Sequence, residues 1–208
     1  VTLAVSSIDN RDYSDICRDL DIRYLKIPEH IELDMQDFAQ RTFTMNTLQW
    51  LNALLDEAFY PYEQNIYQAA IQLAEENDCL IGHHFLYPLK LAAIKRQKPH
   101  ISITLCHAAI PCVSSPPFRS PNLGKFLNPI EWTLLNYIFD WVLKKRLGRL
   151  WKAEGMAEFK HVFPGLLTSD QLNLVAVDPV FCLHRHEWDP VNQASGFLNL
   201  PGNAENWI

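Results

Sequence analysis

Histidine and aromatic side chains stand at the ends of two apolar runs, where they could contact a ligand. The first run is 79–82, and His83, His84 and Phe85 follow it directly. The second run is 101–105, and His107 follows it. Histidine can bind or relay a proton near neutral pH, and ligands of parallel sheets bind beyond the carboxyl ends of the strands. We therefore expect a small-molecule site here. The alternative is that these histidines only cap elements or face solvent.

A second group of side chains could bind a metal. Cys182, His184 and His186 alternate along one segment. Zinc would need a further ligand, such as Cys106 or His107, and the spacing matches no structural zinc motif. We therefore predict no metal site and place Cys182 in the core, at the end of a surface strand.

The elements that position these residues alternate between strand and helix, which predicts an α/β fold with a Rossmann-like parallel sheet flanked by helices. Apolar and β-branched runs predict the strands, and helical spacing of apolar residues predicts the helices. The expected strands are 1–6, 22–27, 79–82, 101–105, 173–177, 180–183 and 194–198, and the expected helices are 13–20, 33–77 with a break at Pro61, 88–97 and 128–151.

The last of these helices, 128–151, is long and follows a proline- and serine-rich loop, 106–124. Asn128 and Pro129 predict its start, as N-cap and first helical residue. Basic residues crowd its end between 144 and 152, where they complement the helix dipole. Contact of this helix with a membrane surface is the alternative.

Composition limits the class of protein. The chain has 208 residues, is 48% hydrophobic and carries a formal net charge of −6, which suits one globular domain, 1–198, and argues against a nucleic-acid partner. Residues 199–208 have the composition of a linker. Five cysteines without a CxxC pattern predict reduced thiols and a cytoplasmic location, with peripheral membrane contact as the open alternative.

Three segments resemble the N-terminal domain of the UDP-glycosyltransferase-like superfamily with the GT-B fold, which includes sterol glucosyltransferases, rhamnosyltransferases and family 28 enzymes. The first runs from Cys79-Leu80-Ile81-Gly82-His83-His84 through an alanine-containing helix to Lys98-Pro99 and the strand 101–105. The second is the Pro/Ser-rich loop with its long helix. The third runs from Val162-Phe163-Pro164 to the ending Ser195-Gly196-Phe197.

The resemblance implies the acceptor-binding half of an enzyme that moves a hexose from a nucleotide-diphosphate sugar to a hydroxyl of a hydrophobic small molecule or lipid. The sugar nucleotide is then a co-substrate, and no cofactor is expected. The catalytic base should lie before Val1 and the partner, a donor-binding domain of the same parent chain, after Ile208, so the chain alone should be inactive and hold no catalytic residue. The alternative is a non-catalytic Rossmann-like binding module that works with a partner chain.

The same resemblance implies where the acceptor would bind. In plant relatives the acid that partners the catalytic histidine lies near the position of His83; the residue here is histidine, so that role is not carried over. Aromatic and aliphatic side chains suit a hydrophobic acceptor. The expected acceptor-binding residues are His83, His84, Phe85, His107, Phe118 and Trp132.

Overall fold

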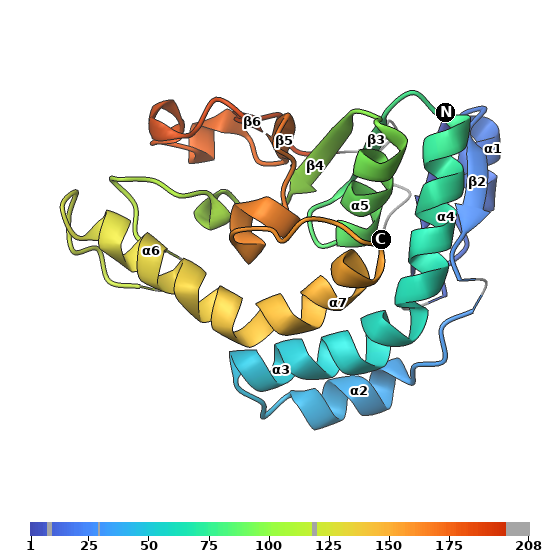
Figure 1. Ribbon diagram of the computed structural model, residues 1–208, viewed down its shortest axis with the longest axis horizontal. Helices are drawn as coiled ribbons and strands as arrows, with labels where there is room; N and C mark the ends of the chain where they lie inside the picture. Colours follow the sequence, from blue (N-terminus) through green and yellow to red (C-terminus); the bar gives the residue numbers. More distant parts are fainter. Residues whose placement is uncertain (8–9, 29, 118–119, 199–208) are drawn as a thin grey trace, which may run out of the picture. The chain divides into compact units, whose positions relative to one another are not determined.

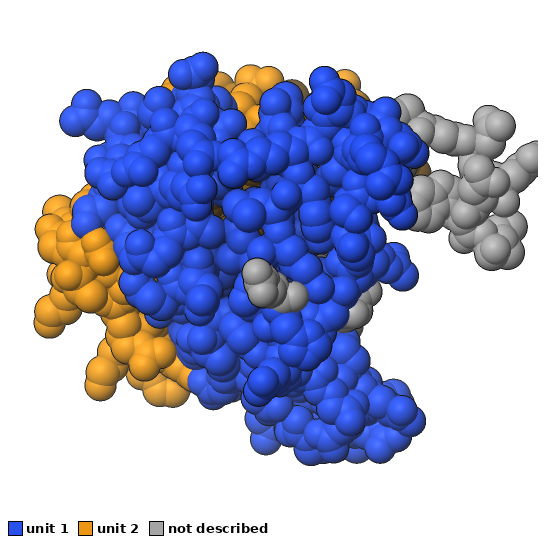
Figure 2. Space-filling model, turned by 90° about the vertical axis from the view of Figure 1, so that its right-hand side faces the viewer, with its two compact units in different colours: residues 1–80, 91–98 blue, residues 81–90, 99–208 orange. Residues whose placement is uncertain are grey.

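The computed structural model describes residues 1–7, 10–28, 30–117 and 120–198 (Figure 1). Its contacts divide the chain into two compact units, coloured separately in Figure 2. Unit 1 comprises residues 1–80 and 91–98, and unit 2 comprises residues 81–90 and the described chain from residue 99 onward. The division falls inside strand β3 and helix α5, so each of these elements contributes residues to both units.

Helices and strands are interspersed along the described chain, with short 3₁₀ and π-helical turns (η) among them. The strands are β1 Thr2–Val5, β2 Arg23–Lys26, β3 Leu80–His83, β4 His100–Thr104, β5 Leu172–Val175 and β6 Asn192–Ala194. The helices are α1 Ser14–Asp19, α2 Met35–Thr42, α3 Thr47–Ala53, α4 Glu63–Glu76, α5 Tyr87–Arg96, α6 Asn128–Phe139 and α7 Lys145–Ala153. The turns are η1 Leu54–Phe59, η2 Tyr60–Tyr62, η3 His107–Ala109, η4 Asp140–Lys144, η5 Val162–Leu166, η6 Pro179–Phe181 and η7 Arg185–Glu187.

Unit 1 begins with the predicted strand–helix–strand motif. β1 and β2 are parallel, with Thr2 opposite Arg23 and Val5 opposite Lys26, and α1 connects them. These two strands form a two-stranded sheet. A parallel pair needs such a crossover because its strands run in the same direction.

The helices of unit 1 start and stop at residues that the sequence marks. The Asp34 carboxylate accepts hydrogen bonds from the first backbone N–H groups of α2, and Asn46 and Gln49 form a capping box on α3. Both devices satisfy N–H groups that have no partner inside the helix. The predicted break at Pro61 is confirmed, since the 3₁₀ turn η2 separates η1 from α4.

The sheet of unit 2 confirms the predicted α/β class with a Rossmann-like arrangement of parallel strands and flanking helices. Its strand order is β3-β4-β5-β6. β4 and β5 are parallel, with Ile101 opposite Leu172 and Thr104 opposite Val175. β5 and β6 are also parallel. The carboxyl ends of β4, β5 and β6 therefore lie at one edge of the sheet (Figure 1).

Buried polar side chains hold these strands in register. The Ser102 and Thr104 hydroxyls of β4 donate hydrogen bonds to Asn173 Oδ1 of β5, at 2.7 and 2.9 Å. Asn173 Nδ2 in turn donates to Asn192 Oδ1 of β6, at 2.8 Å. A shift of one residue would leave these buried groups without partners, which is costly in a low-dielectric interior.

Glycine at position 82 allows close packing between β3 and the start of α5. A Cβ atom at Gly82 would lie 2.4 Å from Leu89 Cδ2, which is inside the van der Waals contact distance. Leu89 is buried and has little room to move. The small residue after the apolar run thus has a packing role in this part of unit 2.

The predicted single helix 128–151 is interrupted. α6 passes through the π turn η4 into α7, and the three form one bent rod (Figure 1). The start also differs from the prediction, because Leu127 is the N-cap and Asn128 is the first helical residue. Asn128 is fully buried; its Oδ1 accepts from Leu123 N and its Nδ2 donates to Val113 O. It holds the preceding loop instead of capping the helix.

Two predicted strands near the end of the chain are also corrected. Residues 180–183 are not a strand, since Pro179 to Phe181 form the 3₁₀ turn η6, which begins where the Asp178 carboxylate accepts a hydrogen bond from Val180 N. The last strand of the described residues is β6, Asn192–Ala194. It overlaps the predicted range 194–198 only at Ala194. Proline at 179 favours the turn because it fixes φ and has no N–H for a sheet.

The buried core agrees with several residue-level expectations. Cys182 is buried, as predicted, although it follows a turn and not a strand. All five cysteines are free thiols. The single domain 1–198 stays a prediction beside the two compact units, and the predicted linker, 199–208, lies outside the described residues.

Candidate functional site

Two segments that follow parallel strands come together at the carboxyl edge of the unit 2 sheet. β4 ends at Thr104 and continues into the turn η3, which starts at His107. β5 ends at Val175 and continues, through Ala176 and Val177, into η6. The segment after each strand lines a common cavity of about 250 Å³.

The cavity wall is mainly apolar and aromatic, with two histidines. One side comes from the segment after β4 and from α6, and the other comes from the turns after β5. The lining residues are His107, Ala108, Ile110, Cys112, Ser115, Pro116, Trp132, Phe181, Cys182, Leu183, His184 and Trp188. Such a wall suits a hydrophobic ligand, and the few polar groups can orient it.

The floor of the cavity is rigid because it belongs to a buried cluster. Ile110, Cys112, Cys182 and Trp188 are packed together with Val175 and Val177. The Trp132 indole N–H donates to two backbone oxygens, Cys112 O at 3.2 Å and Ser115 O at 2.9 Å. A tryptophan held in this way presents its ring in one orientation.

A carboxylate joins the two segments behind the cavity. Glu187 accepts hydrogen bonds from the Cys112 thiol, at 3.0 Å, and from the backbone N–H of Ser114, at 2.9 Å. The Ser114 hydroxyl donates to the same carboxylate. These hydrogen bonds lower the pKa of Glu187 to about 2, and the bond from Cys112 has the largest effect. The carboxylate is therefore charged at neutral pH.

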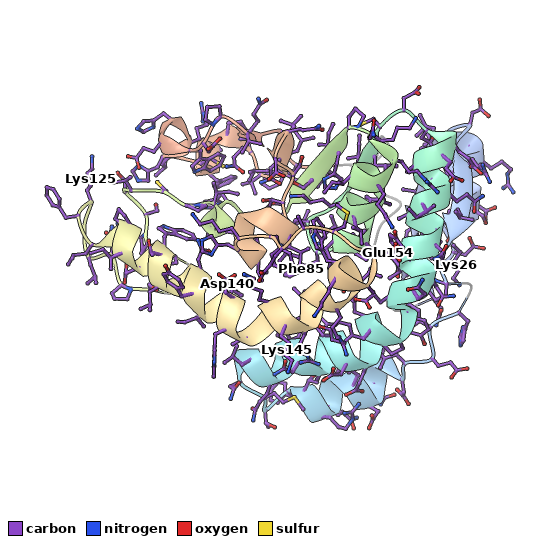
Figure 3. The ribbon with its side chains drawn as sticks, in the orientation of Figure 1. Lys26, Phe85, Lys125, Asp140, Lys145 and Glu154 are labelled. Carbon is purple, nitrogen blue, oxygen red and sulfur yellow. The ribbon has the colours of Figure 1, made fainter. Side chains whose placement is uncertain are left out.

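A separate group of rings lies at the end of β3. His83 and His84 have ring centroids 4.3 Å apart, and His84 and Phe85 are 4.4 Å apart. Phe163 continues the group, 6.0 Å from His84, and Phe139 lies 5.7 Å from Phe163. Figure 3 labels Phe85 among these side chains. The result is an aromatic wall built from three distant parts of the sequence.

Burial controls the charge of this wall. His84 is buried, and burial, reinforced by its neighbour His83, lowers the pKa of His84 to about 4. Burial also lowers the pKa of His83. Since a low dielectric disfavours the charged imidazolium, both rings are mainly neutral at pH 7. His84 Nδ1 lies 3.2 Å from Ile103 O, which keeps the ring in place against β4.

The structure places the predicted site residues in two groups. His83, His84 and Phe85 are in the aromatic wall, and His107 and Trp132 line the cavity. Phe118 lies outside the described residues. Their role in binding an acceptor stays a prediction.

Sequence reasoning missed half of the cavity wall. Phe181, Leu183 and Trp188 belong to a segment of consecutive 3₁₀ turns, which has no periodicity that predicts which side chains face a ligand. His184 was a candidate only for a metal site. The alternation of Cys182, His184 and His186 could not indicate the cavity, since it suggested an extended strand.

Within the described ranges, His, Cys, Asp and Glu side chains form no group of three that could hold a metal ion. Cys182 is directed to the Asp178 carbonyl oxygen, at 3.7 Å, and the rings of His184 and His186 are 6.3 Å apart.

Every helix in the described part of the chain is too short or too polar to cross a bilayer.

Comparison with known proteins supports the fold. No protein-family model matches the sequence, and neither does any curated protein. Eleven chains of solved structures match the structure. One is described as the crystal structure of the glycotransferase of kitacinnamycin; it has a TM-score of 0.56 and 15% sequence identity over 99% of this chain. This chain spans 45% of that glycosyltransferase's length. The likeness shows that this chain shares its fold with part of that glycosyltransferase.

Proposed function

We propose that this chain is the acceptor-binding part of a glycosyltransferase, and that the cavity beside His107 and Trp132 holds the acceptor. The transferred group would be a hexose from a nucleotide-diphosphate sugar, and the acceptor a hydroxyl of a hydrophobic molecule such as a sterol, polyketide or lipid. The observation that supports this most is the position of the cavity at the carboxyl ends of parallel strands, where ligands of open α/β sheets bind.

The composition of the cavity favours a hydrophobic acceptor. Trp132, Phe181, Leu183 and Trp188 offer mostly apolar surface, and burying an apolar ligand against it is favourable by roughly 25 cal/mol per Å². His107 and His184 can hydrogen-bond a hydroxyl at the polar side. The volume of about 250 Å³ suits part of a large molecule, so the remainder of the acceptor would extend beyond the cavity.

The reaction itself would need more than these residues. In an inverting transfer the acceptor oxygen attacks the anomeric carbon, the bond from that carbon to the diphosphate breaks, and a base takes the acceptor proton. The leaving diphosphate needs positive charge or a helix N-terminus. In this proposal the parent chain supplies the base and the diphosphate site. The chain described here binds and orients the acceptor.

A binding assay tests the cavity directly. We expect hydrophobic alcohols from an acceptor panel to change the tryptophan fluorescence of the 208-residue chain on binding, because two tryptophans line the cavity. Leu183→Asp puts an uncompensated charge into the wall and should weaken binding about tenfold or more. Leu183 is exposed in the free chain, so the substitution should leave the fold intact.

The matched control is His186→Asp. His186 is three residues away, its side chain is 72% exposed, and it does not line the cavity. Equal effects of the two substitutions, or binding by neither wild type nor control, would reject the cavity as the acceptor site. Sustained sugar transfer by the isolated chain would reject the assignment of the base and donor site to other parts of the parent.

The second candidate is a non-catalytic binding module that works with a partner chain. The same cavity supports it, because binding needs no donor site. A transfer assay on the full-length parent with UDP- and dTDP-sugars separates the two. Product formation supports the enzyme, whereas acceptor binding without transfer supports the module.

A further inference from the structure

An apolar stripe runs along the solvent-exposed side of α6. From Ile130 to Trp141 its members recur at intervals of three or four residues, which places them on one face of α6 and its continuation in η4, and Phe126 lies just before the helix. All are exposed, with Phe126 at 93% and Trp141 at 84%. The apolar stripe consists of Phe126, Ile130, Leu134, Tyr137, Ile138 and Trp141. Large contiguous apolar surface on a protein usually marks an interaction site.

The acidic residues of this rod are turned away from the stripe. Glu131 Oε2 is buried. The Asp140 side chain is only 15% exposed; it accepts a hydrogen bond from Val162 N and contacts His161 Nδ1. The exposed face of α6 therefore carries apolar groups and no free carboxylate from these two residues. An anionic partner would meet little repulsion here.

Cations stand at both ends of the stripe. Lys125 precedes α6 and Lys145 begins α7, and both are exposed; Figure 3 labels Lys125 before the start of α6 and Lys145 near the bend of the rod, beyond the Trp141 end of the stripe. Beyond Trp141, α7 adds the exposed Lys152. An apolar face bordered by lysines, with tryptophan and tyrosine among the apolar groups, is the composition of helices that lie in a membrane interface.

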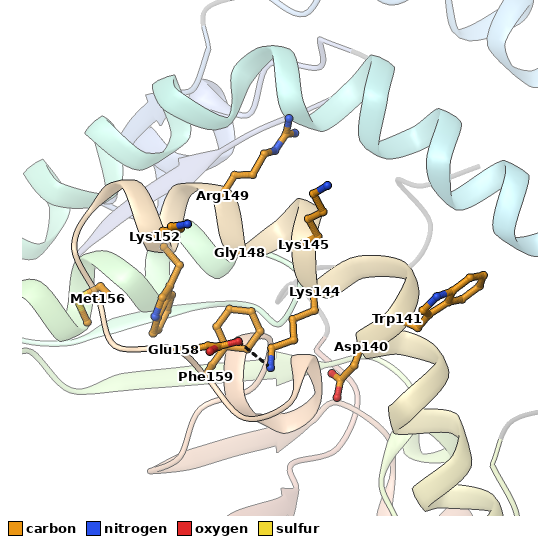
Figure 4. Close-up of a pocket in the computed structure, with 11 residues that line it drawn as sticks. Asp140, Trp141, Lys144, Lys145, Gly148, Arg149, Lys152, Met156, Glu158 and Phe159 are labelled. Atoms are coloured by element: carbon orange, nitrogen blue, oxygen red, sulfur yellow. Dashed lines mark ion pairs between the residues drawn. The ribbon is translucent and has the colours of Figure 1, made fainter.

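A cavity of about 700 Å³ adjoins the Trp141 end of the stripe (Figure 4). Four cations line it, Lys144, Lys145, Arg149 and Lys152, against two carboxylates, Asp140 and Glu158. Its apolar floor includes Phe159, whose ring lies beside Gly148 of α7; a Cβ there would be 3.4 Å from the ring, at ordinary contact distance.

Lys145 and Lys152 of this cavity are exposed and can contact an anion. Lys144 pairs with Glu158 at 3.2 Å, but Glu158 is 82% exposed, so this ion pair is weak. Asp140 is occupied by His161 and Val162. The lysines of α7 can therefore bind a phosphate group that arrives from the side of the apolar stripe.

We propose that the apolar stripe docks on the surface of an anionic lipid bilayer and that the adjoining cationic cavity binds a phospholipid headgroup. Trp141 connects the two parts, since it belongs to the stripe and lines the cavity. The stripe enters the boundary between headgroups and acyl chains, and Lys145 and Lys152 contact lipid phosphates. This inference does not depend on the proposed glycosyl transfer.

Vesicle co-sedimentation of the 208-residue chain tests the docking. We expect strong binding to phosphatidylcholine vesicles that contain phosphatidylserine, weak binding to phosphatidylcholine alone, and a loss of binding as salt is raised. Lys152→Glu should weaken binding to the anionic vesicles about fivefold or more. Trp141→Ser should weaken it about tenfold. Equal binding to both vesicle types, or to neither, would overturn the proposal.

The chain offers a matched control for each substitution. Lys160→Glu makes the same charge change at an exposed residue outside the cavity lining. Phe43→Ser removes an aromatic ring that is 89% exposed and belongs to unit 1. Both controls should bind like wild type. If either control weakened binding as much as its counterpart, the stripe and cavity would not be the docking surface.

Two further measurements exclude other occupants of the stripe. Brominated lipid should quench part of the tryptophan fluorescence of the wild type, and this part should be missing in Trp141→Phe. Sedimentation velocity without lipid should show a monomer. Self-association that Trp141→Ser abolishes, without vesicle binding by the wild type, would show instead that a second copy covers the stripe.

Discussion

His161 Nδ1 lies 2.6 Å from Asp140 Oδ2, and the other carboxylate oxygen of Asp140 accepts a hydrogen bond from Val162 N at 2.7 Å. One side chain of η4 thus anchors the segment that follows α7. Asp140 is labelled in Figure 3, at the bend of the helical rod. Neither residue stood out in the sequence, because twenty residues separate them and neither belongs to a motif.

Loss of the Asp140 anchor should destabilise the chain. We expect Asp140→Ala to lower the free energy of unfolding by about 1.5–3 kcal/mol, because it removes hydrogen bonds to a largely buried carboxylate. Urea denaturation measures the change. The control is Glu158→Ala, which removes an exposed ion pair with Lys144 and should cost less than about 1 kcal/mol. Similar losses for both variants would contradict a special role for Asp140.

The buried polar network in the sheet predicts a second effect. Asn173→Ala leaves the hydroxyls of Ser102 and Thr104 without their acceptor, and each buried unpaired group costs about 1–3 kcal/mol. We therefore expect a loss of more than about 2 kcal/mol in urea denaturation. Gln193→Ala on β6 changes an exposed side chain and serves as control. A loss at Asn173 no larger than at Gln193 would show that the network does not stabilise the sheet.

Two buried histidines predict the pH dependence of stability. The pKa values of His84 and His100 are lowered from 6.5 to about 4, and burial is the largest cause for both. Between these values the unfolded chain binds more protons than the folded chain, so stability is fully present above about pH 6.5 and falls toward pH 4. Across this pH window, each histidine lowers the free energy of unfolding by up to about 3 kcal/mol.

Urea denaturation at a series of pH values measures this loss. His84→Phe should remove the contribution of His84 to the pH dependence, because phenylalanine fits among Phe85 and Phe163 and cannot titrate, whereas His100, and His83 with its lowered pKa, retain theirs. His186→Phe, at a side chain that is 72% exposed, should leave it unchanged. Glu187 does not confuse the result, since its pKa is lowered from 4.5 to about 2 and its contribution is lost only in that more acidic range. A pH-independent stability from pH 7 to 4.5 would refute the assignment.

The loop before α6 should open when Asn128 is replaced. Asn128→Ala removes its bonds to Leu123 N, Val113 O and Asn122 Oδ1. We expect tryptic cleavage after the exposed Lys125 to become about tenfold faster, because local opening becomes easier. Thr133→Ala, which loses only an exposed bond to Pro129 O, should be cleaved like wild type. An unchanged rate in Asn128→Ala would show that other contacts hold the loop.

Local patterns in the sequence were sufficient for the fold class and for most elements. Strand β4 lies within one residue of its predicted start and end, and the break at Pro61 occurs where expected. These features depend on short-range physics, since alternation of apolar residues and the missing N–H of proline act within a few residues. Other expectations failed: the helices 33–77 and 128–151 are interrupted between α2 and α3 and at η4, and the strand 194–198 is displaced. Two of the failures, at Asn128 and Pro179, concern residues with strong local preferences. Asn128 has long-range hydrogen bonds, and the turn at Pro179 replaced an expected strand.

The sequence by itself determined the α/β class, most strands and helices in their order, and the basic end of α7. It also named His107 and Trp132 as acceptor-binding residues, and both line the cavity, while their role stays a prediction. Only the tertiary structure decided that the turns after β5 form the other half of the cavity, that Asp140 and Glu131 turn inward, and that apolar groups of α6 remain exposed. The physical reason is that helical periodicity gives the relative direction of side chains on one helix but not which side meets the core. That choice depends on packing between segments far apart in the chain.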